Sequence, residues 1–283
     1  MPELPEVEIT ARRLDAALRG AEVASALAPG INALKTFDPP LDTLAGRAVA
    51  RVRRRGKHLV VDVTGDLSLL LHLMSAGRLQ LFDKQAGPRD RTSRLLVRLT
   101  DGRELRLREF GTRQAAWVKL LPTAAVEEDA AIASLGPEAW PDPPPLRELL
   151  APEGARPLQA VLRDQHVITG IGRSWADEIL WTARLSPFQR AGDLDDEQAT
   201  ALREAVVGRL GAAIEHYEQV VTLPIPDKLP LPLQVHRHAG EPCPRCGTTI
   251  EAIHYESHVL CYCPADQTGG RVLKDRRLSR LLK

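Results

Sequence analysis

The sequence is poor in aromatic residues, sulfur and net charge. Aromatics make up 4% of its 283 residues, there are two methionines and four cysteines, and the formal net charge is +1. Total charge therefore does not single out a nucleic-acid-binding protein. The longest apolar run, residues 69–74, is interrupted by His72 and is too short to cross a membrane. The acidic start is not a signal peptide. We therefore expect a cytoplasmic protein without a membrane partner.

Charge is clustered even though the total is near zero. One basic cluster falls within seven residues and consists of Arg51, Arg53, Arg54, Arg55 and Lys57. A second cluster, in residues 271–283, sets six basic residues against one acid, Asp275. Two such clusters suit a protein with one phosphate-facing side. Solvated basic loops explain them equally well, so charge alone does not decide.

Hydrophobic periodicity changes along the chain. Residues 5–19 predict a helix, and residues 21–120 alternate apolar with polar side chains, as in an antiparallel sandwich or barrel. Seven prolines between positions 137 and 157 mark a boundary, and helical patterns follow it. We therefore predict an α+β multidomain chain. Its expected parts are a β-sandwich (1–135), a linker (136–150), a helical domain (151–235) and a cysteine module with a basic extension (236–283).

The first eight residues, MPELPEVE, place a proline and acidic groups at the tip of the chain. If Met1 is removed, Pro2 offers a secondary α-amine, which titrates roughly 2–3 pH units below lysine. Such an amine attacks a sugar aldehyde carbon and forms an iminium that promotes β-elimination, while Glu3 could supply protons. An ordinary acidic helix start, with Glu6 complementing the helix dipole, is the alternative.

Several residues of the predicted strands have types that suit DNA contacts. Lys57 follows Gly56 at a turn and could grip a phosphate, although exposed basic hairpins are common. His72 interrupts an apolar run, and a core histidine with its hydrogen bonds met is the usual explanation for such a residue. An apolar wedge, a planar cation and an aromatic ring can fill the gap that an everted base leaves. The side chains of these types are Met74, Arg108 and Phe110.

Two motifs belong to the second half of the chain. The stretch DQHVITGIGRSWADEILW has the outline of a helix, a glycine turn and a second helix, and amides at such a turn can bind phosphate. All four cysteines fall between positions 243 and 263. They form a Cys-x-x-Cys-Gly knuckle and a second pair, which is a strong zinc signal.

Taken together, these stretches resemble the formamidopyrimidine-DNA glycosylase (Fpg/Nei) family from end to end, and the wedge residues resemble its Fpg branch. The resemblance implies a β-sandwich carrying a catalytic N-terminal helix, then a helix–two-turn–helix (H2TH) domain with a β-hairpin zinc finger. It implies Pro2 as Schiff-base nucleophile, Glu3 as general acid, Glu6 as supporting acid and Lys57 as phosphate contact. The DNA-binding positions that it implies are His72, Met74, Arg108, Phe110, Arg173 and His258.

The sequence departs from the family pattern at several of these positions. Arg173 stands where the family has a phosphate-binding asparagine, and His258 where it has a DNA-gripping arginine. The segment 222–235 looks shorter than the loop that caps 8-oxoguanine in Fpg enzymes. Trp175 and Gln159 also differ from the family residues.

The fourth zinc ligand is open in the sequence, because Asp266 stands where the family has its last cysteine. We expect one structural Zn²⁺ held by Cys243, Cys246, Cys263 and Cys261. Cys261 is favoured because it uses every cysteine and because positions 261 and 263 share one face of a strand. Asp266 is the alternative, and a finger folded without metal is a third possibility.

The leading functional hypothesis is a monomeric, bifunctional DNA glycosylase/AP lyase associated with the nucleoid. It would excise oxidised bases from double-stranded DNA containing damaged bases or abasic sites, through a Pro2 Schiff base and β,δ-elimination. The alternative is a non-cleaving or narrowed-specificity relative that binds damaged DNA, which the departures suggest and the intact Pro2, Glu3, Glu6 and Lys57 oppose.

Overall fold

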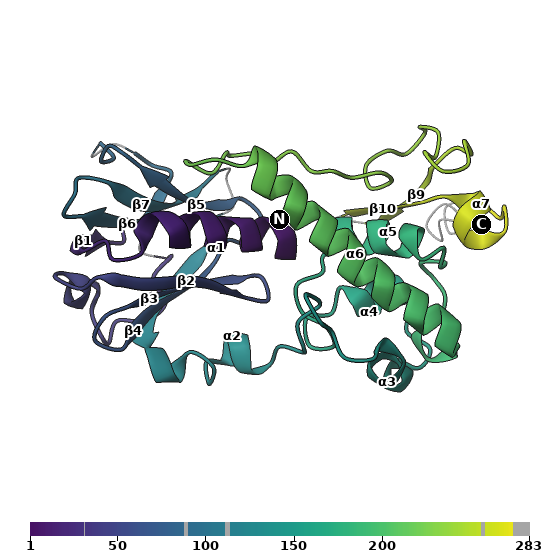
Figure 1. Cartoon of the computed structure of the whole chain (residues 1–283), viewed down its shortest axis with the longest axis horizontal. Coiled ribbons are helices and arrows are strands. Elements are labelled where there is room, and N and C mark those ends of the chain that lie inside the picture. Colours follow the sequence, from purple (N-terminus) through teal and green to yellow (C-terminus); the bar gives the residue numbers. More distant parts are fainter. Residues whose placement is uncertain (31, 88–89, 111–113, 256–257, 274–283) are drawn as a thin grey trace, which may run out of the picture. The chain divides into compact units, whose positions relative to one another are not determined.

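The computed structural model describes residues 1–283 apart from 31, 88–89, 111–113, 256–257 and 274–283, and gives the backbone alone for Tyr255 and His258 (Figure 1). Except for Arg271, the second basic cluster therefore lies outside the described residues. The chain forms two compact units. One comprises Met1–Ser134 with Ile214–Pro230, and the other comprises Leu135–Ala213 with the described residues from Leu231 onward.

The first helix, α1 (Leu4–Leu18), confirms the helix expected at the N-terminus. Pro5 lies in its first turn, where a missing N–H costs nothing. Glu3 is the N-cap and forms a reciprocal capping box with Glu6, which satisfies two amides that the helix leaves open. The buried face of α1, which includes Val7 and Leu14, packs into the core of the sandwich.

Among the described residues, eight strands form two four-stranded antiparallel sheets, ordered β1-β6-β7-β5 and β2-β3-β4-β8. The predicted β-sandwich is therefore confirmed. The strands are β1 (Val23–Leu27), β2 (Val49–Arg55), β3 (His58–Val63), β4 (Leu67–His72), β5 (Gly77–Phe82), β6 (Ser93–Leu99), β7 (Glu104–Glu109) and β8 (Trp117–Pro122).

The core of this unit lies between the sheets and α1. Alternate residues of β3 and β4, such as Leu59, Val61, Leu69 and Leu71, bury their side chains in one cluster. The β3–β4 register pairs His58 with His72, so two histidines lie side by side at the same end of the sheet. A tight turn through Gly56, whose φ is +56°, joins β2 to β3 and carries Lys57.

The second unit is mainly helical and contains a hairpin near its end, as expected. The helices along the chain after the sandwich are α2 (Ala130–Ala133, in the first unit), α3 (Leu146–Leu150), α4 (Leu158–Leu162), α5 (Arg173–Thr182), α6 (Asp196–Val220) and α7 (Pro264–Thr268). Strands β9 (Glu251–Tyr255) and β10 (His258–Tyr262) form the hairpin. Short 3-10 turns cover Leu41–Leu44, Thr123–Ala125, Ala151–Glu153 and Ala191–Asp193.

The last part of α6 belongs to the first unit. Tyr217 and Val221 bury their side chains with Ile9 of α1 and Ile225, so residues 214–230 pack with the sandwich. The range 151–235 predicted for the helical domain runs across this division, because one continuous helix serves both units. The boundaries of the linker (136–150) and of the cysteine module (236–283) stay predictions.

Two buried carboxylates of α5 hold the segment that leads to the hairpin. Glu178, 0% exposed, accepts N–H bonds from residues 234–236 at 2.8–2.9 Å and a bond from Arg209. Asp177 accepts the Cys261 N–H and contacts Nδ1 of His236 at 2.7 Å. Burial raises the pKa of Asp177 to about 6. The second unit is therefore organised around buried polar groups as well as apolar packing.

Within the described chain, no helix combines the length and apolar character needed to cross a membrane.

Candidate functional site

The N-terminal residues are fixed by the start of α1. Glu3 and Glu6 are 3% and 5% exposed, and Pro2 is half-buried ahead of them. The N–H of Glu3 donates a 2.7 Å hydrogen bond to Oε2 of Glu6. Since that N–H belongs to the peptide bond after Pro2, the Glu6 carboxylate also restrains the orientation of Pro2. Three of the predicted catalytic residues thus lie together at one buried helix start.

A tyrosine that sequence reasoning missed completes this arrangement. The hydroxyl of Tyr217 donates a 2.8 Å hydrogen bond to Oε1 of Glu6. Tyr217 is fully buried, and burial raises its pKa well above the usual value, with the negative charges of Glu6 and Glu3 adding to the effect. No local pattern could have identified it, because the two partners are separated by 211 positions.

Lys57 and His72 lie near one another in the first unit. Lys57 is 7% exposed at the β2–β3 turn. Burial lowers the pKa of His72 to about 3, and the charges of His58 and Lys57 contribute. His72 is therefore neutral near pH 7. Its Nδ1 accepts the N–H of Met74 at 3.0 Å, which leaves the ring proton on Nε2 as a donor.

The predicted wedge residues occupy two places in the same unit. Met74 has a φ of +50°, an unusual conformation for a side-chain-bearing residue, and its bond to His72 helps to hold it. Arg108 lies over the ring of Phe110 at 4.7 Å and donates to Gln80 at 3.2 Å. Arg108 and Phe110 therefore form one stacked pair, and Met74 lies on a strained turn.

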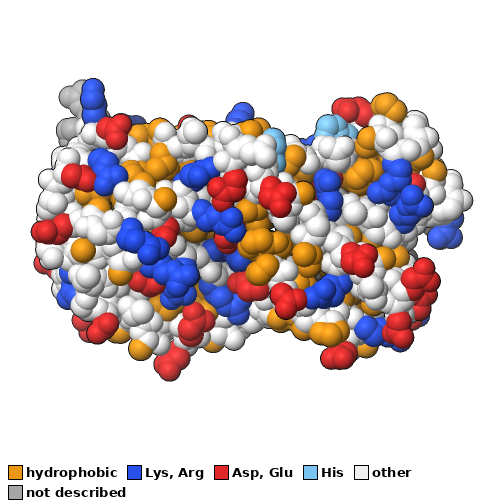
Figure 2. Space-filling model, viewed as in Figure 1, with side chains coloured by type: hydrophobic (Ala, Val, Ile, Leu, Met, Phe, Trp, Pro, Cys, Tyr) orange, Lys and Arg blue, Asp and Glu red, His pale blue; other side chains and the backbone are white. Residues whose placement is uncertain are grey.

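The basic cluster of residues 51–57 is partly neutralised. Arg54 pairs with Glu8 at 2.9 Å, and its side chain is 6% exposed. Arg53 pairs with Asp62 at 2.9 Å. Lys and Arg side chains gather over the region of α1 and β2 in Figure 2. Part of this positive surface consequently belongs to internal ion pairs, which reduces its capacity for phosphate.

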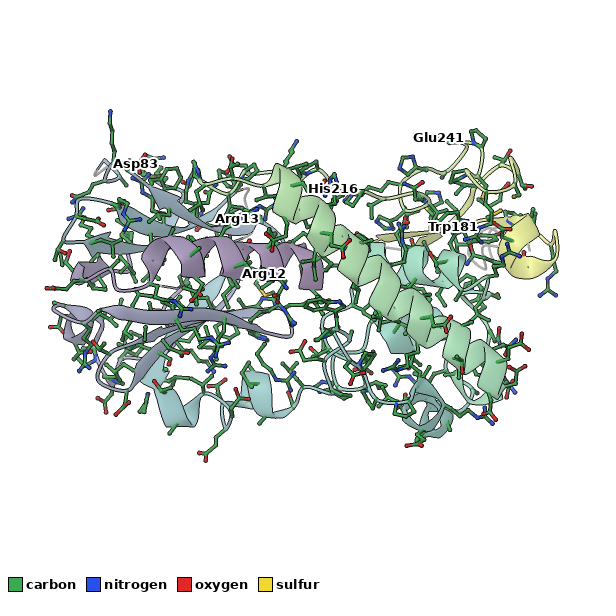
Figure 3. The ribbon with its side chains drawn as sticks, in the orientation of Figure 1. Arg12, Arg13, Asp83, Trp181, His216 and Glu241 are labelled. Carbon is green, nitrogen blue, oxygen red and sulfur yellow. The ribbon has the colours of Figure 1, made fainter. Side chains whose placement is uncertain are left out.

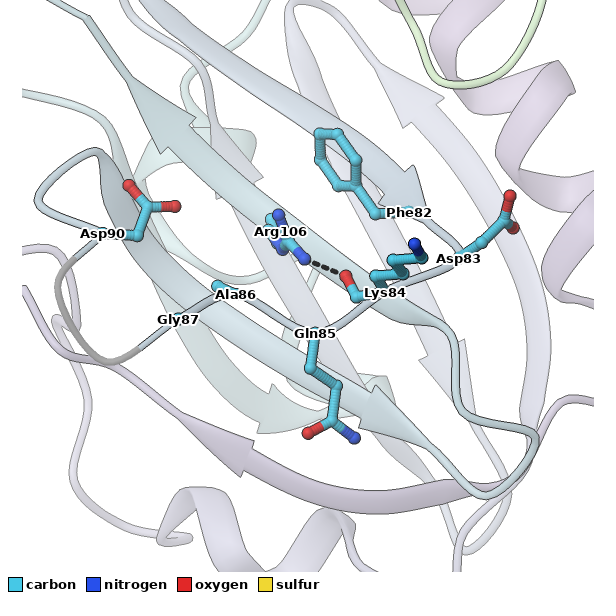
Figure 4. A pocket seen from close by; sticks show the side chains of 8 residues that line it. All are labelled: Phe82, Asp83, Lys84, Gln85, Ala86, Gly87, Asp90 and Arg106. Carbon is cyan, nitrogen blue, oxygen red and sulfur yellow. Dashed lines mark hydrogen bonds between the residues drawn. The ribbon is translucent and has the colours of Figure 1, made fainter.

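A hollow of about 410 Å³ lies beside β5 (Figure 4). Its lining includes Phe82, Lys84, Asp90 and Arg106, and Arg106 donates to the Lys84 carbonyl. None of the predicted catalytic or DNA-binding residues lines it. The hollow nevertheless adjoins one of them, because the Arg108 guanidinium lies 5.7 Å from the centroid of the Phe82 ring.

Two predicted DNA contacts lie in the second unit. Arg173 is the first residue of α5, follows the N-cap Gly172 and is half-buried. The backbone of His258 belongs to β10, and its side chain lies outside the described residues. The structure therefore gives a side-chain position for one of them, at a helix N-terminus.

A group of potential metal ligands lies beside the hairpin. The ligand atoms of Cys243, Cys246, Cys263 and Asp266 all lie within 4.8 Å of one another. The Sγ atoms of Cys246 and Cys263 are 3.4 Å apart, and Sγ of Cys243 is 3.6 Å from Oδ2 of Asp266. Three thiols and one carboxylate converging on one point could hold a metal ion.

Cys261, the expected fourth ligand, does not belong to this group of ligand atoms. Strand β10 ends at Tyr262, and Cys263 is already the N-cap of α7, so positions 261 and 263 do not share a strand face. Cys261 is buried, and its thiol interacts with the backbone N–H groups of Arg237 and Ala239. Asp266, the alternative, occupies the fourth place in the cluster.

An arginine supports the carboxylate of this cluster. Nη1 of Arg245 lies 3.3 Å from Oδ2 of Asp266 and 3.0 Å from the carbonyl oxygen of Trp181. Its guanidinium also stacks over the Trp181 ring at 4.2 Å (Trp181 is labelled in Figure 3). Asp266 is thus oriented by a fixed cation rather than left to turn toward water.

Comparison with known proteins places these features in a family. The model of the formamidopyrimidine-DNA glycosylase N-terminal domain matches residues 1–114, and the model of that enzyme's H2TH domain matches residues 142–224. A formamidopyrimidine-DNA glycosylase from Pediococcus pentosaceus is 32% identical over 278 residues, which cover 93% of this chain and 98% of the relative.

Solved structures agree with these matches. The Lactococcus lactis Fpg (MutM) in a complex with DNA containing N7-benzyl-Fapy-dG has a TM-score of 0.84 and 26% identity, and covers 94% of this chain and 100% of that one. The same enzyme bound non-covalently to DNA containing an AP site has a TM-score of 0.81 at 26% identity, covering 94% and 99%. The chain therefore belongs to the formamidopyrimidine-DNA glycosylase family.

Proposed function

We propose that this protein is a bifunctional DNA glycosylase/AP lyase of base excision repair that acts on damaged bases and abasic sites in duplex DNA. The observation that carries the proposal is the N-terminus, where Pro2 precedes a helix start with two buried carboxylates, Glu3 and Glu6. A chain that only binds DNA has no need of a restrained secondary amine at its tip. The relatives crystallised with damaged and abasic-site DNA support the same substrate class.

Pro2 is the proposed nucleophile. With Met1 removed, its amine attacks C1′ of the damaged nucleotide, and the C1′–N bond to the base breaks as the base leaves with a proton. The C1′–O4′ bond then opens, O4′ takes a proton, and the resulting iminium cation links protein and sugar. The cation acidifies the adjacent carbon, so β-elimination and then δ-elimination break the strand. Glu3 supplies or accepts protons beside the sugar. Glu6, with both oxygens hydrogen-bonded, holds the peptide that carries Pro2.

The remaining site residues hold DNA in this proposal. His72 donates Nε2–H to a phosphate, and Lys57 and Arg173 supply positive charge. Met74, Arg108 and Phe110 fill the space left by the everted nucleotide. Phosphate contacts of this kind make binding weaken steeply as salt rises. We further propose that the protein acts as a monomer and works in the cytoplasm, where the nucleoid supplies its substrate.

We infer that the cysteine cluster holds one structural Zn²⁺. Three thiols and a carboxylate are donors that zinc accepts in a closed four-coordinate site. When bound, the ion would cross-link the Cys243–Cys246 knuckle to the residues around Cys263 and Asp266. It takes no part in the proposed chemistry.

Borohydride trapping on a duplex with one abasic site tests the proposal. We expect wild-type protein with a free Pro2 to give a covalent complex, and Glu3→Gln to cut the DNA more slowly. A formamidopyrimidine-DNA glycosylase of known activity serves as the parallel control. If the control is trapped, and this protein binds the duplex but is not trapped, the protein is a damage-binding relative and the lyase proposal is rejected. If this protein is trapped, a panel of lesion-bearing duplexes would identify the base that it prefers to excise.

A further inference from the structure

We propose that Tyr217 is a positioning residue that sets the orientation of the Pro2 nucleophile through Glu6. This inference rests on the proposed function and adds a residue that neither the sequence motifs nor the helix start contains. Tyr217 does not touch substrate in this account. It acts through two consecutive hydrogen bonds that begin on α6 and end at the peptide after Pro2.

The two hydrogen bonds converge on the Glu6 carboxylate. Tyr217 donates to Oε1 of Glu6 at 2.8 Å, and Oε2 of Glu6 accepts the N–H of Glu3 at 2.7 Å. Each carboxylate oxygen therefore has its own donor, and the plane of the carboxylate is fixed by both. The Glu3 N–H belongs to the Pro2–Glu3 peptide, so rotation of the Glu6 side chain would turn the peptide that carries the nucleophile.

Tyr217 keeps its proton, which the chain of bonds requires. The side chain is fully buried. Burial raises its pKa far above the ordinary value, and the negative charges of Glu6 and Glu3 act in the same direction. The phenol is thus a donor at every pH at which the protein works. Its neutral hydroxyl also compensates one oxygen of the buried Glu6 carboxylate for lost hydration.

The end of α6 that carries Tyr217 is firmly attached to α1. Ile9, Tyr217, Val221 and Ile225 form one buried cluster. Arg13 of α1 donates to the carbonyl oxygens of Glu218 and Val221, which satisfies carbonyls at the end of α6. Arg12 also pairs with Glu218 at 2.8 Å. Figure 3 labels Arg12 and Arg13 on α1, the helix that Pro2 precedes.

Such an anchor matters because the nucleophile is at a chain end. Chain ends are ordinarily mobile unless something ties them down. A displacement of about 1 Å in the attacking atom can cost about a hundredfold in rate. Pro2 is bonded directly to the peptide whose N–H Glu6 accepts, so the rigidity of Glu6 reaches the reactive nitrogen.

The test compares Tyr217→Phe with wild-type protein in single-turnover trapping on an abasic duplex. Phenylalanine keeps the ring and removes only the donor. We expect the trapping rate to fall by about tenfold to a hundredfold, since a hydrogen bond to a buried charged group is lost. The dissociation constant for a duplex with a non-cleavable abasic analogue should stay within about twofold, because Tyr217 is not a DNA contact.

Ile9→Val is the matched control, because it removes one methyl group from the same cluster and no polar contact. It should lower the melting temperature but leave the trapping rate near wild type. In a Glu6→Ala background, Tyr217→Phe should have little further effect, because its partner is gone. Circular dichroism on every variant identifies any that fails to fold.

Two outcomes separate this inference from the proposed function. If wild-type protein is not trapped, the lyase proposal fails. If wild-type protein is trapped and folded Tyr217→Phe is trapped at the same rate, the proposed function stands and the positioning role of Tyr217 is overturned. Equal losses in Tyr217→Phe and Ile9→Val would also overturn it, since packing alone would then account for the effect.

Discussion

Oδ2 of Asp266 lies 3.6 Å from Sγ of Cys243, within a group that also contains Cys246 and Cys263. The carboxylate comes from the first turn of α7, one turn after Cys263, so a single short segment supplies two members of the group. Cys261 lies on the strand before it and bonds elsewhere. The position of Asp266 favours the ligand set with Asp266 over the one with Cys261.

Metal content should therefore depend on Asp266 and not on Cys261. We expect about one zinc per chain in wild type and in Cys261→Ala. Loss of a residue that only hydrogen-bonds to a metal ligand lowers metal affinity roughly 10–100-fold. Asp266→Ala removes a ligand itself, so its zinc affinity should fall by more than this. Elemental analysis after dialysis against a weak chelator checks this. Zinc loss in Cys261→Ala with retention in Asp266→Ala would contradict the assignment.

His58 should make the fold less stable as the solution becomes acidic. Burial lowers its pKa from 6.5 to about 4, and its Nδ1 has no hydrogen-bond partner among the described residues. The unfolded chain therefore binds this proton more readily than the folded protein does. The stability linked to His58 is complete above pH 6.5 and is lost as the pH falls toward 4.

The variant His58→Phe isolates this effect. Between pH 7 and pH 5, wild-type protein should lose about 2 kcal/mol of unfolding free energy more than the variant. Urea denaturation of both proteins at the two pH values measures the difference. Groups such as Asp177 titrate in both proteins and cancel. Parallel pH dependence in wild type and variant would show that His58 is not held neutral by burial.

Glu178 should be among the most sensitive positions for stability. It is fully buried and accepts three backbone N–H bonds and one from Arg209. Glu178→Ala leaves these donors without an acceptor and should cost about 3–5 kcal/mol, whereas Glu178→Gln keeps part of the acceptor capacity and should cost less. Thermal unfolding gives both values. A loss below about 1 kcal/mol for the alanine variant would refute this role.

The two ring nitrogens of His72 should have separable functions. Asparagine places an acceptor near the position of Nδ1, and glutamine places a donor near that of Nε2. His72→Asn should keep the bond to the Met74 N–H but weaken DNA binding about tenfold. His72→Gln should bind DNA nearly as well as wild-type protein, but it should lose the hydrogen bond that holds the turn at Met74.

Base eversion and binding distinguish these two variants. A fluorescent base analogue beside the lesion should report slower eversion of the damaged nucleotide in His72→Gln than in His72→Asn. Titration with an abasic-analogue duplex should show that His72→Gln binds DNA more tightly than His72→Asn. If both variants lose affinity and eversion together, the hydrogen bond to Met74 does not have a separate role.

Local patterns were enough for the elements whose signals are local. Hydrophobic periodicity over residues 5–19 predicted α1, alternation predicted the strands of the sandwich, and cysteine spacing predicted the cluster around Cys243 and Cys246. The position of Cys261 outside the cluster has a local cause as well. Strand alternation was extended by one residue past the end of β10, where Cys263 begins a helix instead.

Contacts between distant parts of the chain could not be read in this way. Tyr217 meets Glu6 only because the end of α6 packs on α1, and a tyrosine within a long helix gives no sign of it. The arginines after position 50 look free for phosphate in the sequence. In the folded chain Arg54 instead meets Glu8, which lies 46 positions away.

The chemical identity of the attacking group is central to the proposed function. Mass spectrometry of the borohydride-reduced complex, after proteolysis and nuclease digestion, locates the sugar remnant. We predict that it is attached to the amine of Pro2 in a peptide that lacks Met1, and that protein retaining Met1 or an N-terminal tag is not trapped. A remnant on Lys57 or another side chain, or equal trapping with Met1 in place, would contradict the account.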